Sequence, residues 1–499
     1  MSSPRANHGS TSMTKELRRT SIIVLVMIAS LFVSTSIIQV VDSDTLAAAP
    51  TNSRTFYANN SVNRGPILVA GSPVAYSVPS DGPIAYQRVY TDGPLYAPVT
   101  GYLTIGQGNT GLEAAMNDYL TGTNGGQFLD QLNAVLTGQR PAGAAVETTI
   151  DPAVQQAAWD ALGDMTGAAI AIDPKTGKIL ALVSKPSYDP NELAVHDTAA
   201  VIQRYNELLK DPSDPLIDRA MNGNLDPPGS TFKLVVAAAA LEDGYTSDST
   251  FANPAALQLP QSSSVIHNIS RGTCGSGDTV SIFDAVRLSC NIPMAELGQE
   301  LTYQPIYEKA NAFGFNQSID IAGGAGLAST PSAYPRYLDV PQTMLSAFGQ
   351  SDVRASPLQM AMVSMAIANG GTIMQPTLVD QVIGADQSTL VSFQPQVFGQ
   401  PIDSTTAQAL TAMMVAAVSN GASSGAQIPG ISVAGKTGTA QNGTDEANTL
   451  WFTGFAPADD PQVVVAVVVQ NGGGRGSTAT GSAVAAPVAK AMIKAVMGQ

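Results

Sequence analysis

The most apolar part of the chain is residues 21–41, SIIVLVMIASLFVSTSIIQVV, which contain no charged residue. A run of about 20 apolar residues is long enough to cross a bilayer as one helix. The residues around it are asymmetric in charge, with Arg5, Lys15, Arg18 and Arg19 before it and Asp42 and Asp44 after it. Because positively charged flanks stay in the cytoplasm, we expect residues 1–20 to form a cytoplasmic tail, residues 21–41 a transmembrane anchor, and the remainder to lie outside the cell.

A cleaved signal peptide is the competing interpretation of the same run. The small residues Leu46–Ala49 would suit a cleavage site. Signal peptides have shorter apolar regions than residues 21–41, so the pattern favours an uncleaved anchor.

Residues 43–148 alternate between short apolar pieces and turn-forming residues. The pieces GPILVAG and PIAYQRVY are typical of strands, and Gly, Pro, Ser and Asn surround them. No catalytic set of residues is evident in this region. We therefore expect a small N-terminal spacer or docking domain here.

The pattern changes at residue 149. In TTIDPAVQQAAWDAL, Asp151 is suited to cap a helix, Pro152 to its first position, and apolar residues follow at helical spacing. GAAIAID and KILALVS then flank Pro174–Gly177, which predicts a β-hairpin whose turn contains Lys175, Thr176 and Gly177. In such a turn Lys175 should point into water.

The rest of the chain is mainly helical from residue 190 to 368 and then returns to strands. ISVAGKTGTA, LWFTGFAPA and QVVVAVVVQN predict three strands, and GSAVAAPVAKAMIKAV predicts a closing amphipathic helix. The predicted order is a hairpin, a helical insertion, further strands and a last helix. This order indicates an α/β (α+β) fold: an antiparallel sheet flanked by helices, with a helical subdomain. We expect residues 149–499 to form this domain.

Composition narrows the choice of partners. The chain has 499 residues and a net charge of −15. Phosphate binding needs clustered basic residues, so a nucleic-acid partner is not expected. With three histidines, two cysteines and no Cys/His cluster, the sequence shows no zinc site. Outside the membrane Cys274 and Cys290 can pair as a disulfide, and two unlinked buried thiols are the alternative.

The first candidate for chemistry is LDPPGSTFKLVVAAAALEDG, residues 225–244. Pro227, Pro228 and Gly229 interrupt the chain, and an apolar helix follows. Ser230 at its start and Lys233 three residues later share one face. The free N–H groups of a helix start favour an oxyanion or an alkoxide-like serine, and a desolvated Lys233 would act as a neutral base. The plainer interpretation is a capping serine and a lysine that reaches water.

Two further motifs follow. In DAVRLSCNIPMAELG, Ser289 and Asn291 flank Cys290 between two predicted helices, so a hydroxyl that passes a proton and an amide that holds a peptide would point the same way. An ordinary Ser/Asn cap is the alternative. Because Cys290 would face elsewhere, it is free to bond Cys274.

Lys-Thr-Gly occurs a second time as Lys436, Thr437 and Gly438, followed by Thr439. An edge strand there would present Lys436 as a fixed positive charge, and Thr437 and Thr439 as hydroxyls for a carboxylate. Gly438 would let a substrate lie close to the backbone. A simple turn is again the alternative.

The three motifs come in the order Ser-x-x-Lys, Ser-x-Asn, Lys-Thr-Gly, which is the signature of the penicillin-recognising serine acyltransferases. The chain resembles a class B penicillin-binding protein, a membrane-anchored D,D-transpeptidase of peptidoglycan synthesis, and most resembles the actinobacterial penicillin-binding protein A group. The resemblance covers residues 149–499 and extends to AIAIDPKTGKILALVSKPSYDPN, PPGSTFK, AFGF, GQSDVRASPLQMAMVSMAIANGG and WFTGFAPAD. Residues 43–148 match poorly apart from NRGPI at 63–67.

The resemblance implies a role for each motif. It makes Ser230 the acylated nucleophile, Lys233 its base, and Ser289 the group that passes a proton to the leaving amine. It implies that Asn291 binds the substrate amide. Lys436 would hold the charge network.

The resemblance also gives the substrate-binding groups. Thr437 and Thr439 would bind the terminal carboxylate of a D-Ala-D-Ala stem peptide, with Gly438 beside them. The N–H groups of Ser230 and Thr439 would form the oxyanion hole. β-Lactams would imitate D-Ala-D-Ala and acylate Ser230, with no cofactor.

Partners and alternatives follow from the same resemblance. We expect divisome or elongasome proteins, including a glycosyltransferase, as partners. A D,D-carboxypeptidase would differ only in using water as acceptor. A β-lactam sensor or division scaffold is the non-enzymatic alternative, and a β-lactamase of the usual kind would need no anchor or spacer.

Overall fold

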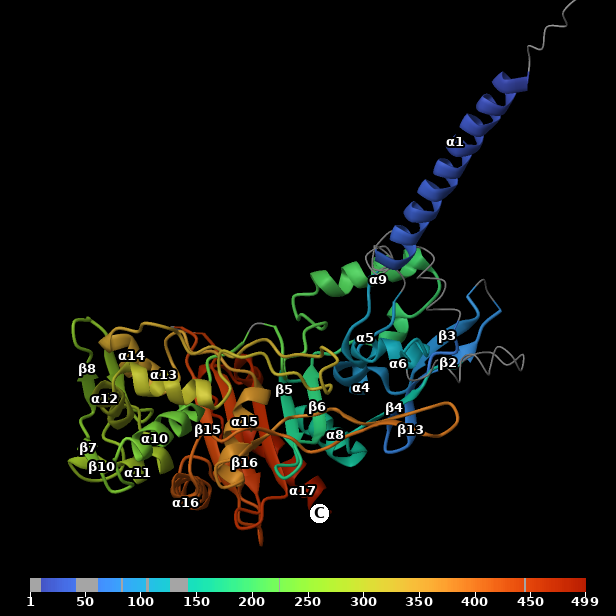
Figure 1. The fold of residues 1–499 in the computed structure, drawn as a ribbon. Coiled ribbons are helices and arrows are strands. Elements are labelled where there is room, and N and C mark those ends of the chain that lie inside the picture. The colour runs from blue at the N-terminus through green and yellow to red at the C-terminus, as the bar shows by residue number, and fades with distance from the viewer. Residues whose placement is uncertain are drawn as a thin grey trace, which may run out of the picture. The chain divides into compact units, whose positions relative to one another are not determined.

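The computed structural model describes residues 10–41, 62–81, 84–104, 107–125, 142–223, 225–443 and 446–499. Its first element is the helix α1 (Ser10–Ser36), which continues as a π-helical turn at Ile37–Val41 (Figure 1). The stretch Lys15–Gln39 is long and apolar enough to cross a membrane, and none of it is buried in the protein. Arg5, Asp42, Asp44 and the candidate cleavage segment Leu46–Ala49 lie outside the described residues.

The first sheet combines strands from two distant parts of the chain. Its strands are β1 (Ile67–Val69), β2 (Ser72–Pro79), β3 (Tyr86–Tyr90), β4 (Ala145–Thr148), β12 (Val379–Ile383) and β13 (Thr389–Ser392). They lie in the order β13-β12-β4-β1-β2-β3, with β1 and β4 parallel and the other pairs antiparallel. The long hairpin β12–β13 thus extends the N-terminal sheet, which local periodicity did not predict.

The described residues between β3 and β4 form short helices that were also not predicted: α4 (Gly93–Thr100), α5 (Gly111–Ala115) and α6 (Asn117–Thr121). One of them carries the fully buried Glu113, which accepts hydrogen bonds from Arg64 and Arg88, each at 2.6 Å. Burial alone would raise the pKa of Glu113, but the two arginines hold it below its usual value. This buried charge triad connects Arg64, which precedes β1, and Arg88 on β3 through Glu113 on α5.

The second sheet is the predicted antiparallel one. Its strands are β5 (Gly167–Ile172), β6 (Ile179–Lys185), β15 (Ala434–Ala440), β16 (Thr449–Ala456) and β17 (Val463–Val469). The order is β15-β16-β17-β5-β6, so the first and last parts of the domain pair in its middle and β15 forms one edge. The predicted hairpin, the three late strands and the edge position of the Lys436 strand are all confirmed.

Helices cover both faces of this sheet because its strands are apolar on both sides. On one face lie α8 (Pro152–Leu162), which Asp151 caps as predicted, and the closing helix α17 (Ala485–Val496). On the other lies α15 (Pro357–Ala368), whose residues belong to the larger core (Figure 1). The expected fold of helices on an antiparallel sheet is therefore confirmed.

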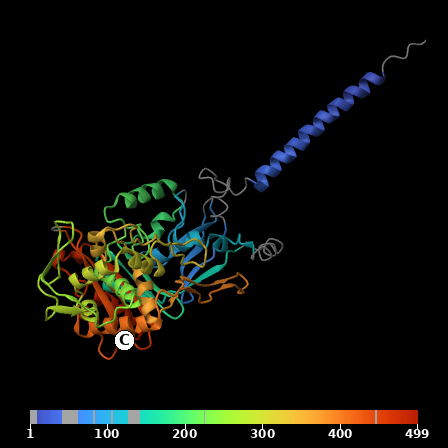
Figure 2. The same cartoon turned by 60° about the vertical axis from the view of Figure 1, so that its left-hand side comes forward.

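The helical part lies beside the β15 edge (Figure 1), and Figure 2 shows the same cartoon from a second direction. Its helices are α10 (Lys233–Glu242), α11 (Ile282–Arg287), α12 (Ile292–Leu301), α13 (Tyr303–Ala312), α14 (Val340–Ser346) and α16 (Ser404–Asn420), and α9 (Thr198–Lys210) precedes them. Short strand pairs between the helices were not predicted: β7 (Thr250–Ala252) with β10 (Thr279–Ser281), β8 (Ala256–Gln258) with β9 (Val265–His267), and β11 (Ile373–Met374) with β14 (Val397–Gly399).

Candidate active site

Ser230 lies on a tight turn that its neighbours hold in place. Gly229 has a left-handed backbone (φ +52°) and its N–H donates to the Gly349 carbonyl at 3.0 Å. The indole N–H of Trp451 donates to the Pro227 carbonyl at 2.9 Å, which ties the turn to β16. The turn is a single 3-10 helix, Gly229–Thr231, that leads into α10. Ser230 is 4% exposed, and the described residues offer its hydroxyl no hydrogen-bond partner.

Lys233, at the start of α10, is completely buried. Its ammonium donates to the Ser289 carbonyl at 2.8 Å and to Oδ1 of Asn291 at 2.9 Å. Burial, and to a smaller extent the charge of Lys436, lowers the pKa of Lys233 well below its ordinary value. The alternative in which this side chain reaches water is therefore wrong, and the desolvated lysine is confirmed.

Ser289 and Asn291 fall between α11 and α12, as predicted. Ser289 has a left-handed backbone (φ +64°), an uncommon conformation for serine that often occurs at functional sites. Asn291 accepts from Lys233 through its oxygen and donates to the His267 carbonyl at 3.0 Å through its nitrogen. Cys290 between them bonds Cys274, so the two-free-thiol alternative is wrong.

Lys436 reaches the same point from β15. It is completely buried, and its ammonium donates to Oγ of Ser289 at 2.7 Å and to the Thr437 carbonyl at 3.0 Å. Burial lowers the pKa of Lys436 to about 7. Ser289 thus contacts both lysines, one through its hydroxyl and the other through its carbonyl.

The threonines of β15 differ in what their hydroxyls are free to do. Thr437 donates to the Ala422 carbonyl at 3.0 Å and is within 3.2 Å of Ser423 Oγ, so its proton is already used. Thr439 accepts from the Gly481 N–H at 3.2 Å, which leaves its proton available. Of the two predicted carboxylate ligands, Thr439 has the free donor.

Gly438 has a structural role that the sequence did not indicate. A Cβ at this position would lie 2.7 Å from the Pro228 carbonyl oxygen and 3.0 Å from Cβ of Trp451. The glycine therefore lets β15 approach the Ser230 turn closely. That Gly438 also lets a substrate lie close to the backbone stays a prediction.

A cleft of about 410 Å³ adjoins these groups, and Ser289, Thr437, Thr439 and Gly481 line it together with the loop that carries Cys274. No group of three or more potential metal ligands occurs among the described residues. The cleft therefore presents hydroxyls and backbone groups to a ligand, and the lining residue Ser289 contacts the two buried lysines behind it.

Three supporting residues were missed by sequence reasoning. Gly349 holds the Ser230 turn, Ser423 accepts the Thr437 N–H at 3.0 Å, and Asn268 accepts the N–H of Asn291 at 2.9 Å. Each acts through a contact with a residue far away in sequence. Gly349 lies in a segment that resembles the family, but no local pattern indicated what any of the three would contact.

The comparisons with known proteins agree with this geometry. A family model described as the penicillin binding protein transpeptidase domain matches residues 167–494, and one described as the penicillin binding protein A dimerisation domain matches residues 64–146.

Among curated proteins, the chain is 41% identical to peptidoglycan D,D-transpeptidase PbpA of Mycolicibacterium smegmatis, over 97% of this chain and 99% of that protein. It is 39% identical to the Mycobacterium tuberculosis protein of the same name, again over 97% of this chain and 99% of that protein. The structure resembles penicillin-binding protein A from M. tuberculosis in a ceftriaxone acyl-enzyme complex, with a TM-score of 0.84, 38% identity, and 88% and 100% of the two chains covered.

Proposed function

The chain belongs to the penicillin-binding protein transpeptidases, and we propose that it is a peptidoglycan D,D-transpeptidase that works through an acyl-serine intermediate. The observation that carries this proposal is the convergence of Lys233 and Lys436 on Ser289, with Ser230 on the turn that leads into the Lys233 helix and its hydroxyl without a hydrogen-bond partner among the described residues. Among the described residues, the histidine side chains hydrogen-bond elsewhere, to the carbonyls of Tyr86 and Ala255. The two buried lysines supply the basic groups that other serine enzymes obtain from histidine.

Acylation begins at Ser230. Its Oγ attacks the carbonyl of the penultimate D-Ala of a stem peptide, and neutral Lys233 takes the hydroxyl proton. Burial, which disfavours the ammonium form, supports that role for Lys233. The bond to the terminal D-Ala then breaks, and Ser289 passes a proton to the leaving amine. Lys436 donates to the Ser289 hydroxyl, which orients it for that transfer.

Substrate positioning falls to the neighbouring groups. Asn291 holds the substrate amide, and the backbone N–H groups of Ser230 and Thr439 stabilise the oxyanion. Thr439 donates to the terminal carboxylate, while Thr437 and Gly438 keep β15 in place against Ser423 and Pro228. An amine from a second stem peptide then attacks the acyl-serine, which forms the cross-link and restores Ser230.

We propose that helix α1 anchors the enzyme in the cell membrane with its N-terminus in the cytoplasm. The basic residues before the span support this orientation. Residues 1–20 would form the tail, 21–41 the anchor, 43–148 the docking domain and 149–499 the transpeptidase domain. The family model that matches residues 64–146 is described as a dimerisation domain. The proposed docking domain would therefore bind a second copy of the chain as one of its partners. Divisome or elongasome proteins with a glycosyltransferase are the proposed partners.

The test is mass spectrometry of the detergent-solubilised protein with a stem-peptide thioester and a D-amino acid. We expect an acyl adduct on Ser230 and a product in which the D-amino acid replaces the thiol. Ser230→Ala should abolish both, and Ser419→Ala, at an exposed serine of α16, should abolish neither.

Each other outcome selects a different function. An adduct that is only hydrolysed would indicate a D,D-carboxypeptidase. A penicillin adduct without turnover of the thioester would indicate a sensor. No adduct of either kind would reject the assignment.

A further inference from the structure

A second cavity lies away from the cleft at Ser289, where residues 97–102 and 110–111 meet strand β6 and the segment 215–223. Its volume is about 360 Å³. Residues from both family-model ranges line it: Tyr102 and Thr110 come from the N-terminal range, and Tyr188, Tyr205 and Asp218 from the transpeptidase range. A ligand in this cavity would contact both parts of the chain.

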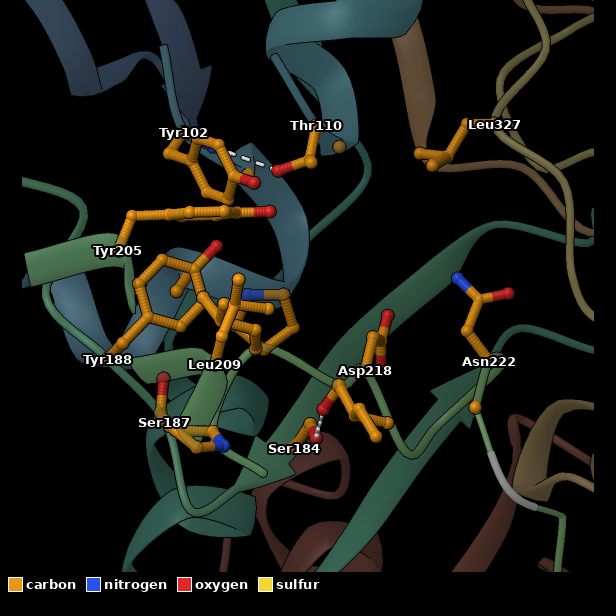
Figure 3. A pocket seen from close by; sticks show the side chains of 18 residues that line it. Tyr102, Thr110, Ser184, Ser187, Tyr188, Tyr205, Leu209, Asp218, Asn222 and Leu327 are labelled. Atoms are coloured by element: carbon orange, nitrogen blue, oxygen red, sulfur yellow. Dashed lines mark hydrogen bonds between the residues drawn. The ribbon is translucent and has the colours of Figure 1, made fainter. Parts of the chain in front are cut away.

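Three tyrosines form one wall of the cavity. The ring of Tyr102 meets those of Tyr188 and Tyr205 edge to face, with centroids 5.9 and 6.2 Å away. Figure 3 shows the hydroxyls of all three directed toward the open space. Burial raises the pKa of Tyr102 and of Tyr188, so both stay neutral at physiological pH. The wall therefore offers aromatic rings and neutral hydroxyls.

Asp218 supplies the one charged side chain among the described residues that line the cavity. One of its carboxylate oxygens accepts the Ala220 N–H at 2.9 Å, and the other has no hydrogen-bond partner among the described residues. Its carboxylate points into the space between the tyrosines and Asn222 (Figure 3). Burial raises the pKa of Asp218 to about 7, against the lowering effects of the Ala220 N–H and of the Arg219 charge.

Asn222 lies on the opposite side of the cavity. Its amide oxygen accepts the Thr330 N–H at 3.0 Å, and its amide nitrogen is turned toward the cavity in Figure 3. The described residues give that nitrogen no hydrogen-bond partner. Asp218 and Asn222 are both partly exposed, so polar groups on two walls of the cavity are accessible to a ligand.

We propose that this cavity binds a small organic cation, an ammonium-bearing compound whose charge pairs with Asp218 and whose carbon frame lies against the three tyrosines. Aromatic faces and a carboxylate both attract cations, and no lining lysine, arginine or histidine among the described residues would repel one. The same absence disfavours an anion. The Asn222 amide is left to bind a carbonyl or hydroxyl of the compound.

The proposal is tested with a matched pair of probes, cyclohexylammonium and cyclohexanol, which share a ring and differ in charge. Isothermal titration of the detergent-solubilised full chain should show the ammonium binding roughly tenfold more tightly than the alcohol, a difference of about 1.4 kcal/mol. Glucose, as a neutral saccharide, should bind no better than cyclohexanol. Equal binding of the pair, no binding of either, or tighter binding of glucose would each overturn the proposal.

Two variants test whether the preference for the ammonium probe over the alcohol depends on Asp218. Asp218→Asn preserves shape and should abolish the difference between the two probes. Asp214→Asn, which removes an exposed carboxylate on the same segment and suits its left-handed backbone, should leave the difference intact. If Asp218→Asn fails to fold, Tyr205→Ala on partly exposed α9 should weaken both probes. Penicillin labelling of Ser230 confirms that each variant is folded. A preference that survives Asp218→Asn would reject the site.

Discussion

The chain contains Lys-Thr-Gly twice, and the two copies have opposite environments. Lys175, Thr176 and Gly177 form the turn between β5 and β6, where Lys175 is about half exposed and pairs with Asp460 at 2.7 Å. Lys436 is completely buried on β15 and donates to Ser289. The same three residues therefore form a hairpin turn in one place and part of a buried charge network in the other.

The glycines show the same contrast. Gly177 has a left-handed backbone (φ +83°), and a Cβ there would lie 2.2 Å from the Gln375 carbonyl oxygen. Gly438 lies in a regular strand and is needed because the Pro228 carbonyl lies close by. The turn needs glycine for its φ angle and for space, whereas the strand needs it for space alone.

The largest expected effect separates the two lysines. Lys436→Ala removes the donor to the Ser289 hydroxyl, so acylation by fluorescent penicillin should slow roughly a hundredfold or more. Lys175→Ala should leave the acylation rate near that of the wild type, because Lys175 contacts only the exposed Asp460 and its own turn. Stopped-flow labelling measures both. Equal losses would mean that the wrong copy was assigned to the site.

A second expected effect concerns stability and pH. Free lysine has a pKa of about 10.4, and burial lowers the pKa of Lys436 to about 7 in the folded chain. Between these values the unfolded chain binds a proton that the folded chain does not, so the unfolding free energy should rise with pH in that window. Lys436→Met has no amine at this position, so its unfolding free energy should rise less with pH over the same window.

Urea denaturation at pH 7.5 and 9.5 tests this expectation. The unfolding free energy of the wild type should gain roughly 2 kcal/mol relative to Lys436→Met between the two pH values. Lys175→Met, at an exposed position, is the matched control and should show no such gain. A constant difference between the wild type and Lys436→Met would indicate that Lys436 stays charged when buried.

Local patterns predicted much of the fold because they report periodicity and turns. The predictions of the β5–β6 hairpin, the Asp151 cap and strands β15–β17 all depend on residues within one or two elements. The pairing of β12 with β4 in the N-terminal sheet could not be predicted in this way, because pairing between distant strands leaves no local signal in the sequence.

The same limit applies to the site. Motif order predicted that Lys233, Ser289 and Lys436 belong to one site, and hydrogen bonds join these three residues. Which threonine hydroxyl remains free is decided by contacts with Ala422 and Gly481. Those partners come from loops whose sequence carries no periodicity. The site's residue types were thus predictable, and their hydrogen-bond partners were not.

The smallest expected effect concerns the pair Lys175–Asp460, whose side chains are 53% and 71% exposed. A double-mutant cycle with Lys175→Ala and Asp460→Ala should give a coupling of less than about 1 kcal/mol, because water screens both charges and fixing two long side chains costs entropy. High salt should reduce the coupling further. A coupling energy above about 2 kcal/mol that salt does not reduce would show that the Lys175–Asp460 pair also stabilises the fold. Lys175 and Lys436 would then differ in their partners and not in whether their charge contributes to stability.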